Sequence, residues 1–251
     1  MRQFSANLGF LWQDLPLPDA IRAAKSAGFD AVECHWPYDT PAAETRQALE
    51  ETGLAMLGIN TIRGNPGENG LAALPGRETE ARAAIDQALD YAKEIGAGAV
   101  HVMAGFATGP QAHATFVENL CYAADRAPDL TILIEPLNRH DAPNYFLTTT
   151  DQAREIIAET GKPNVKLMFD CYHIGRTEGD VTTRFRALQP LVGHVQFASV
   201  PDRGIPDQGE LNFAHIFAQI AAAGWTRPLG AEYKPGRPTG ETLGWMDALR
   251  G

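Results

Sequence analysis

The feature of this sequence that most limits its fold is a unit that recurs about every 30 residues along the chain. In each unit an amphipathic, helix-like stretch is followed by a glycine and then by a short apolar run typical of a strand. The junction glycines are Gly28, Gly53, Gly96, Gly161 and Gly224. Alternating helices and strands of this kind predict a parallel sheet covered by helices.

The number of units selects one architecture within this class. Strands are expected at 4–10, 31–36, 55–61, 99–105, 131–137, 165–170, 192–198 and 228–233, and the clearest helix at 78–95. Eight units in 251 residues predict a single (β/α)8 TIM barrel, an α/β fold that occupies residues 1–251 as one domain. A doubly wound open sheet would more often stop at five to seven strands and carry a glycine-rich phosphate turn. No GxGxxG motif occurs, so we expect no nucleotide cofactor.

Composition and charge exclude several functional classes. The chain is 44% hydrophobic, as in ordinary globular proteins, and no apolar stretch reaches the roughly 18 residues of a membrane span. A net charge of -10 without a basic cluster argues against nucleic-acid binding. Cys34, Cys121 and Cys171 are too few and too scattered for a disulfide framework, and no signal peptide is visible. We therefore expect a cytoplasmic protein with neither membrane nor nucleic-acid partners.

Polar residues stand at the ends of four consecutive predicted strands. They are Glu135, Asp170, Gln196 and Glu232, spaced 26 to 36 residues apart, which is about one unit each. Taken singly, each has an ordinary structural explanation as an ion-pair partner or helix cap. Three carboxylates and an amide at one barrel mouth instead call for a cation that neutralises them. Because all four side chains offer oxygen, one divalent ion, Mn²⁺ or Mg²⁺, is expected.

Two further side chains could contact a substrate. His173 follows Asp170 closely, which places its imidazole at the rim of the same pocket, where it could bind a substrate oxygen. Arg203 lies in the loop after the seventh strand, where a guanidinium could hold a substrate carboxylate or hydroxyl. For both, the alternative is a solvated loop residue. The irregular stretch 63–77 follows the third strand and is a candidate lid.

Other polar residues of the strands are assigned supporting roles. Glu33 and His35 share one face of the second strand and could face the pocket, although a supporting role is the simpler interpretation. His194 sits one layer deeper than Gln196, and His101 is interpreted as a hydrogen-bonded interior histidine. No arrangement of residues typical of a serine or cysteine nucleophile occurs.

An ordered set of motifs resembles one family along nearly the whole chain. The motifs are VECHWP (32–37), NPG (65–67), PGRE (75–78), HVMAG (101–105), IEPLN (134–138), DCYH (170–173), GELN (209–212), EYKP (232–235) and LGW (243–245). This set is similar to that of the hydroxypyruvate isomerase family, in the xylose isomerase-like TIM-barrel superfamily. The resemblance implies an isomerase that interconverts hydroxypyruvate and tartronate semialdehyde through an enediolate.

The resemblance also implies residue roles. Glu135, Asp170, Gln196 and Glu232 would bind the metal, Glu135 and Glu232 would also be the acid/base pair, and His173 and Arg203 would contact the substrate. It implies a small hydroxy-acid, oxo-acid or sugar substrate, and a homodimer or homotetramer.

Several alternatives remain open. The same site could serve a 2-oxo-tetronate isomerase or a ketose 3-epimerase, and a metal-assisted hydride shift would use similar ligands. An apurinic endonuclease of the endonuclease IV type shares the barrel, but it needs more histidines than His173, and the charge of -10 opposes DNA. A catalytically inactive binding barrel is disfavoured because all four proposed ligands are present.

Overall fold

The computed structural model describes all 251 residues as nine strands, nine helices and two short 3-10 segments. The strands are β1 (Phe4–Asn7), β2 (Ala31–Glu33), β3 (Ala55–Met56), β4 (Ile59–Asn60), β5 (Ala99–His101), β6 (Thr131–Ile134), β7 (Val165–Asp170), β8 (Val192–Phe197) and β9 (Leu229–Ala231). The helices are α1 (Leu17–Ser26), α2 (Ala42–Thr52), α3 (Glu78–Ile95), α4 (Gly109–Arg126), α5 (Thr150–Thr160), α6 (Cys171–Thr177), α7 (Val181–Leu188), α8 (Phe213–Ala222) and α9 (Trp245–Arg250). The 3-10 segments are Gln189–Leu191 and Thr239–Thr242.

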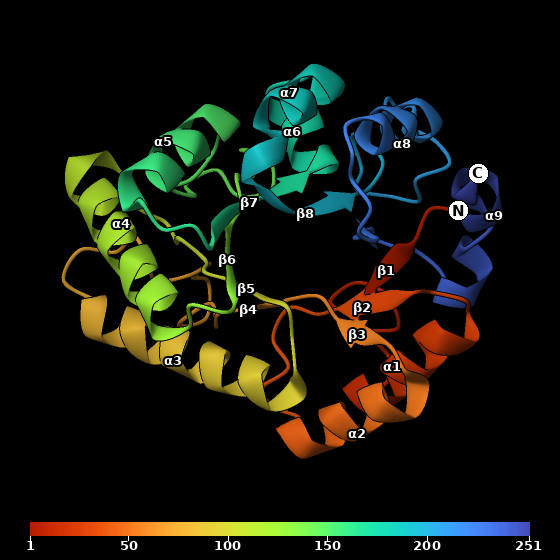
Figure 1. Ribbon diagram of the computed structural model, residues 1–251, viewed down its shortest axis with the longest axis horizontal. Coiled ribbons are helices and arrows are strands. Elements are labelled where there is room, and N and C mark those ends of the chain that lie inside the picture. The colour runs from red at the N-terminus through yellow and green to blue at the C-terminus, as the bar shows by residue number, and fades with distance from the viewer.

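The strands form one parallel sheet that curls into a barrel inside a ring of helices (Figure 1). The strand order is β3-β2-β1-β9-β8-β7-β6-β5-β4, and every pairing in it is parallel. This arrangement confirms the predicted TIM barrel.

The predicted strand 55–61 is wrong as a single element. It is broken at Leu57 and Gly58 into β3, which pairs with β2, and β4, which pairs with β5. The backbone N–H of Leu57 donates to the carbonyl of Val32 at 2.8 Å, and that of Asn60 to the carbonyl of His35 at 2.8 Å. The segment therefore changes its pairing partner midway. Because β3 and β4 are the two edge strands of the sheet, this connection brings the edges together.

Several predicted strands are also too long at their carboxyl ends. β1, β5 and β6 end at Asn7, His101 and Ile134, which is three, four and three residues before the predicted limits. Beyond these points part of the backbone bonds to side chains: the N–H of Met103, for example, donates to Thr61 Oγ1 at 3.0 Å. The apolar pattern continues there because these residues remain buried.

The helix predicted at 78–95 is confirmed as α3. Its alanines and isoleucines at three- and four-residue spacing are buried, and Gly96 ends it in the left-handed conformation, with φ of 69°. Gly53 ends α2 in the same way, with φ of 67°. A side chain would be strained at both positions. No helix in the structure has the length and apolar character needed to cross a bilayer.

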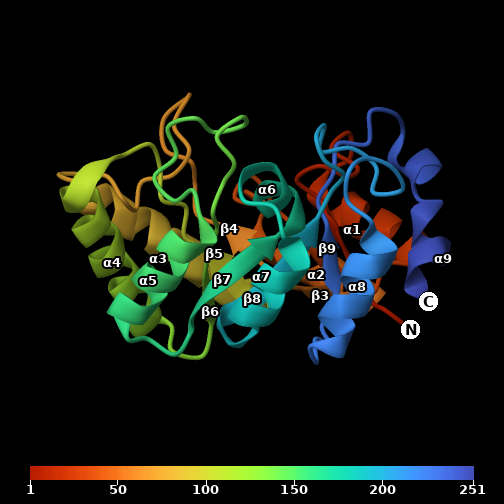
Figure 2. The same ribbon diagram turned by 90° about the horizontal axis from the view of Figure 1, so that it is seen from above.

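The loops that leave the carboxyl ends of β4, β6, β8 and β9 rise on one side of the barrel (Figure 2). At the outside of β1, Phe4 packs against Phe197, Phe217 and Trp245 with ring centroids 5.0 to 5.9 Å apart, which ties β8, α8 and α9 together. The N–H of Arg2 donates to the carbonyl of Arg250 at 3.0 Å, so the two termini lie side by side. This apolar outer layer holds the barrel rigid around a polar interior.

Candidate active site

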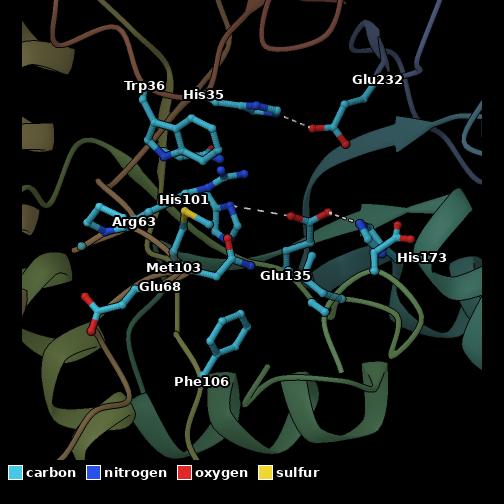
Figure 3. A pocket seen from close by; sticks show the side chains of 18 of the residues that line it. His35, Trp36, Arg63, Glu68, His101, Met103, Phe106, Glu135, His173 and Glu232 are labelled. Carbon is cyan, nitrogen blue, oxygen red and sulfur yellow. Dashed lines mark hydrogen bonds and ion pairs between the residues drawn. The ribbon is translucent and has the colours of Figure 1, made fainter. Parts of the chain in front are cut away.

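A cavity of about 590 Å³ opens at the carboxyl ends of the strands (Figure 3). Its wall combines strand-end residues with the loop that follows β4. The polar and aromatic lining residues used below are Phe10, His35, Trp36, Arg63, Glu68, His101, Phe106, Glu135, Asp141, His173, Arg203 and Glu232.

The four predicted metal ligands converge at the floor of this cavity and are hereafter the ligand group. Glu135 and Glu232 directly follow β6 and β9 and line the cavity, whereas Asp170 ends β7 and Gln196 lies in β8 beneath it. Asp170 and Gln196 are aligned neighbours in the sheet. All four are at most 6% exposed.

Three members of the ligand group have a buried oxygen without a hydrogen-bond partner. These atoms are Glu135 Oε1, Asp170 Oδ2 and Gln196 Oε1. Ligand atoms of Glu135, Asp170 and His173 lie within 4.8 Å of one another. Buried oxygens left unpaired are costly, and a hard divalent cation between Glu135 and Asp170 would satisfy theirs, with Gln196 next to Asp170 in the sheet. The residues present therefore fit a metal ion.

The amide of Gln196 is oriented by the polar interior of the barrel. Its Nε2 donates to Glu33 Oε1 at 3.0 Å, so its oxygen is the atom left free. Glu33 also accepts hydrogen bonds from Ser5 at 3.2 Å and Asn7 at 3.1 Å, and it contacts His194 Nε2. The supporting role expected for Glu33 matches these contacts, since it holds Gln196 rather than facing the cavity.

His173 presents an N–H to the site. Its Nδ1 accepts a hydrogen bond from the backbone N–H of Asn138 at 2.9 Å, which leaves the proton on Nε2. That Nε2 lies 3.6 Å from Asp170 Oδ2 and 3.8 Å from Glu135 Oε1. Burial lowers the pKa of His173 to about 3, so the ring is neutral. In this tautomer His173 is a hydrogen-bond donor to a bound oxygen rather than a metal ligand.

Arg203 enters the site from the loop after β8. Its guanidinium is paired with Glu232 and lies 3.6 Å from Asp170 Oδ2. The Arg203 Cζ lies 4.7 Å from the ring centroid of Phe10 and 5.0 Å from that of Tyr172, so the charge contacts two aromatic rings. The arginine predicted to contact substrate thus reaches the site, where it balances part of the ligand group's charge.

The carboxyls of the ligand group differ in acidity. Burial raises the pKa of Glu135 well above its ordinary value, and the charges of Glu232 and Asp170 add to the rise. Burial also raises the pKa of Asp170 to about 7, although Arg203 opposes the rise. In Glu232 burial acts in the same direction, but Arg203 and the hydrogen bond with His35 outweigh it and the pKa falls to about 2. Two carboxyls whose surroundings shift their pKa values in opposite directions, as for Glu135 and Glu232, are the arrangement an acid/base pair needs.

The structure brings further residues to the cavity that the sequence analysis placed in supporting roles or left unassigned. His101 is not the hydrogen-bonded interior histidine that was expected: both ring nitrogens lack partners, and its Nδ1 lies 3.7 Å from Glu135 Oε2. His35 Nε2 lies 2.8 Å from Glu232 Oε1, and its ring approaches Gly9 so closely that a Cβ there would clash. The sequence analysis gave no separate role to three other lining residues. Trp36 was named only as part of the motif at 32–37, and Arg63 and Glu68 only as part of the candidate lid at 63–77.

Comparison with known proteins places the chain. Fold and cavity together define a barrel enzyme with a buried acidic site. Residues 21–249 match the family model described as Xylose isomerase-like TIM barrel, and the chain belongs to that family. A 2-oxo-tetronate isomerase from Cupriavidus necator is 41% identical over the full length of both chains. A putative hydroxypyruvate isomerase from Homo sapiens is 43% identical, covering 97% of this chain and 94% of its own.

A crystal structure described as an AP endonuclease, family 2, from Brucella melitensis covers both chains completely, with a TM-score of 0.95 and 36% identity. The names of the two isomerase relatives confirm the expected class, an isomerase related to hydroxypyruvate isomerase.

Proposed function

We propose that the protein interconverts hydroxypyruvate and tartronate semialdehyde, using Mn²⁺ or Mg²⁺ held by Glu135, Asp170, Gln196 and Glu232. The observation that carries this proposal is the set of three unpartnered buried oxygens, on Glu135, Asp170 and Gln196; Glu135 lines the cavity together with Glu232. The names of full-length relatives support the substrate class.

The substrate and its product differ in which of two adjacent carbons carries the carbonyl, so the reaction moves one proton from carbon to carbon and a second from the hydroxyl oxygen to the carbonyl oxygen. A bound divalent cation would supply the positive charge that stabilises the enediolate between them. Glu232, whose pKa is lowered by Arg203 and His35, would take the first proton, and Glu135, whose pKa is raised by burial, would return one to the other carbon. His173 donates its Nε2–H to a substrate oxygen.

A four-carbon substrate, a 2-oxo-tetronate, is the second candidate. The cavity of about 590 Å³ exceeds the needs of a three-carbon acid, and the relative from Cupriavidus necator is named for the longer substrate. The reacting end of the two substrates is the same, so the same residues would act on both.

The test is proton NMR of the Mg²⁺-loaded protein in D₂O with hydroxypyruvate and, separately, with a 2-oxo-tetronate. We expect the isomeric product, carrying solvent deuterium at the reacting carbon. Glu232→Gln should abolish product formation, whereas Glu118→Gln, a matched change at an exposed residue of α4, should not. Product without deuterium would favour a hydride shift, and absence of product from either substrate would contradict the proposal.

An endonuclease activity is tested alongside, because one similar structure carries that description. His35 and His101 line the cavity together with His173, so the cavity holds more histidines than the sequence analysis assigned to it. The net charge of -10 still opposes a polyanionic substrate. Cleavage of an oligonucleotide with one abasic site, by protein that leaves both oxo acids unchanged, would replace the isomerase proposal.

A further inference from the structure

The loop that follows β4 carries a guanidinium, Arg63, that faces the cavity without an acidic partner. Its Cζ lies 3.9 Å from the centroid of the Trp36 ring, and Figure 3 shows the side chain extending along that ring, across the cavity from His173. Trp36 Nε1 donates to the carbonyl of Thr61 at 3.0 Å, and the N–H of Gly70 donates to the carbonyl of Arg63 at 2.8 Å. Both the ring and the base of the arginine are therefore held by backbone contacts.

The other charged groups at this part of the cavity are already paired. Arg203 is engaged by carboxylates of the ligand group. Glu68, the acid on the same loop as Arg63, is paired with Arg77 instead. Asp141 accepts hydrogen bonds from two neighbouring side chains, at 2.8 and 3.1 Å. Arg63 is thus a positive charge at the cavity wall that no neighbour neutralises.

We propose that Arg63 binds the carboxylate of the substrate and so makes the site selective for small 2-oxo and 2-hydroxy acids over neutral ketoses. This inference rests on the proposed function and assigns the residue that recognises its substrate. A guanidinium lying flat on an indole keeps its edge N–H groups free, and that edge matches the two oxygens of a carboxylate. Anchoring the carboxylate there also keeps it away from the acids of the ligand group.

The test compares two substrates that differ at one group. Dihydroxyacetone has a CH₂OH where hydroxypyruvate has its carboxylate, and both can exchange a proton at the reacting carbon. Arg63→Met should raise KM for hydroxypyruvate about 10- to 100-fold, the effect of losing a hydrogen bond to a charged group. It should change kcat little and leave deuterium exchange into dihydroxyacetone unaltered. Arg63→Lys, which keeps the charge but loses the planar edge, should lie between Met and wild type.

A matched control is Arg139→Met, which removes an exposed arginine outside the cavity and should change neither substrate's kinetics. Trp36→Leu removes the ring on which Arg63 lies and should raise KM for the acid less than Arg63→Met does. An Arg63→Met variant with an unchanged KM for hydroxypyruvate would overturn the inference, as would equal losses for the acid and the neutral compound.

Calorimetry with D-glycerate separates this inference from the proposed function. Wild type should bind D-glycerate more tightly than glycerol, and Arg63→Met should remove that preference. Binding with this pattern but without turnover of hydroxypyruvate would reject the isomerase activity and keep the role of Arg63. Turnover with no preference for glycerate in wild type would keep the activity and reject the role of Arg63.

Discussion

The two sides of the cavity are built in different ways. On the side of the ligand group, Asp170 and Gln196 are 1% and 3% exposed; Gln196 donates to Glu33 in the barrel interior, and Asp170 accepts the N–H of Tyr172 at the start of α6. On the side formed by loops, Arg63 in the loop after β4 is exposed, and Phe106 in the loop after β5 is 39% exposed. Strands therefore fix the groups that carry out the proposed chemistry, and loops carry the groups that recognise the rest of the substrate. A change of substrate preference can then arise on the loop side without disturbing the ligand group.

The largest effect is expected from removing an acid/base group on the rigid side. Glu135→Gln should lower kcat by about 10²- to 10⁴-fold, because the amide cannot deliver a proton. KM should change little, in contrast to Arg63→Met. The comparison is made by steady-state kinetics with hydroxypyruvate, with thermal unfolding as a check on folding. A variant that keeps more than a tenth of wild-type kcat would remove Glu135 from the mechanism.

A second prediction concerns how much the buried charge of Asp170 lowers the free energy of unfolding when no metal is bound. The pKa of Asp170 is raised to about 7 in the folded protein, mainly by burial, against about 3.9 in an unfolded chain. The folded state therefore holds this proton more tightly: the resulting stability is present below about pH 4 and is lost as the pH rises through about 7. In EDTA, Asp170→Asn should be more stable than wild type at pH 8, by on the order of 2–4 kcal/mol.

That gain should disappear near pH 4, where wild-type Asp170 is protonated as well. The Asn side chain can still accept the N–H of Tyr172, which Asp170 Oδ1 accepts at 2.8 Å, so the helix cap is kept. Urea unfolding across this pH range measures the difference. Equal stability of the two proteins at pH 8 would show that the ligand group is not strained by its own charge.

Sequence reasoning succeeded where a local pattern carries its own boundaries. The helix at 78–95 has a strict apolar stripe and a terminal glycine, and the strand at 165–170 stops at the charge of Asp170; both were predicted to the residue. The break at Leu57 and Gly58 was missed because an apolar run does not indicate which neighbouring strand its backbone pairs with, and here β3 pairs with β2 but β4 pairs with β5. Those choices depend on contacts distant in sequence.

The residues of the candidate site likewise fall into those that a local sequence pattern predicts and those that it does not. The ligand group could be predicted because polar residues that end apolar runs stand out, and barrel geometry brings those ends together. His101 was assigned wrongly because alternation gives the face of a strand but not how close a residue lies to a cavity. Arg63 was missed because its loop has no periodicity, and its contact with Trp36 depends on how that loop lies.

A third prediction tests how the rigid side is held. Glu33→Ala removes the acceptor that orients Gln196 and should weaken Mn²⁺ binding about 10- to 100-fold, the usual cost of losing such a supporting contact. Glu33→Gln keeps an oxygen that can face Gln196 Nε2 and should restore most of the affinity. Calorimetric titration with Mn²⁺ gives both values. Equal affinities of the Ala variant and wild type would mean that Gln196 is oriented by something else.

The smallest effect is expected on the loop side, where the anchor of the loop itself is weak. Glu68 pairs with Arg77 and accepts the backbone N–H of Asn65 at 2.7 Å, but both charged side chains are about a quarter exposed. Such pairs contribute at most about 1 kcal/mol, so Glu68→Gln should change the free energy of unfolding by less than that. KM for hydroxypyruvate should rise by less than about fivefold, the factor that 1 kcal/mol corresponds to.

Glu50→Gln on α2, which removes a surface ion pair with an N–O distance of 3.8 Å, is the matched control and should leave KM unchanged. A loss of kcat in Glu68→Gln as large as that of Glu135→Gln would break the division of labour between the two sides, because the loop would then take part in the chemistry.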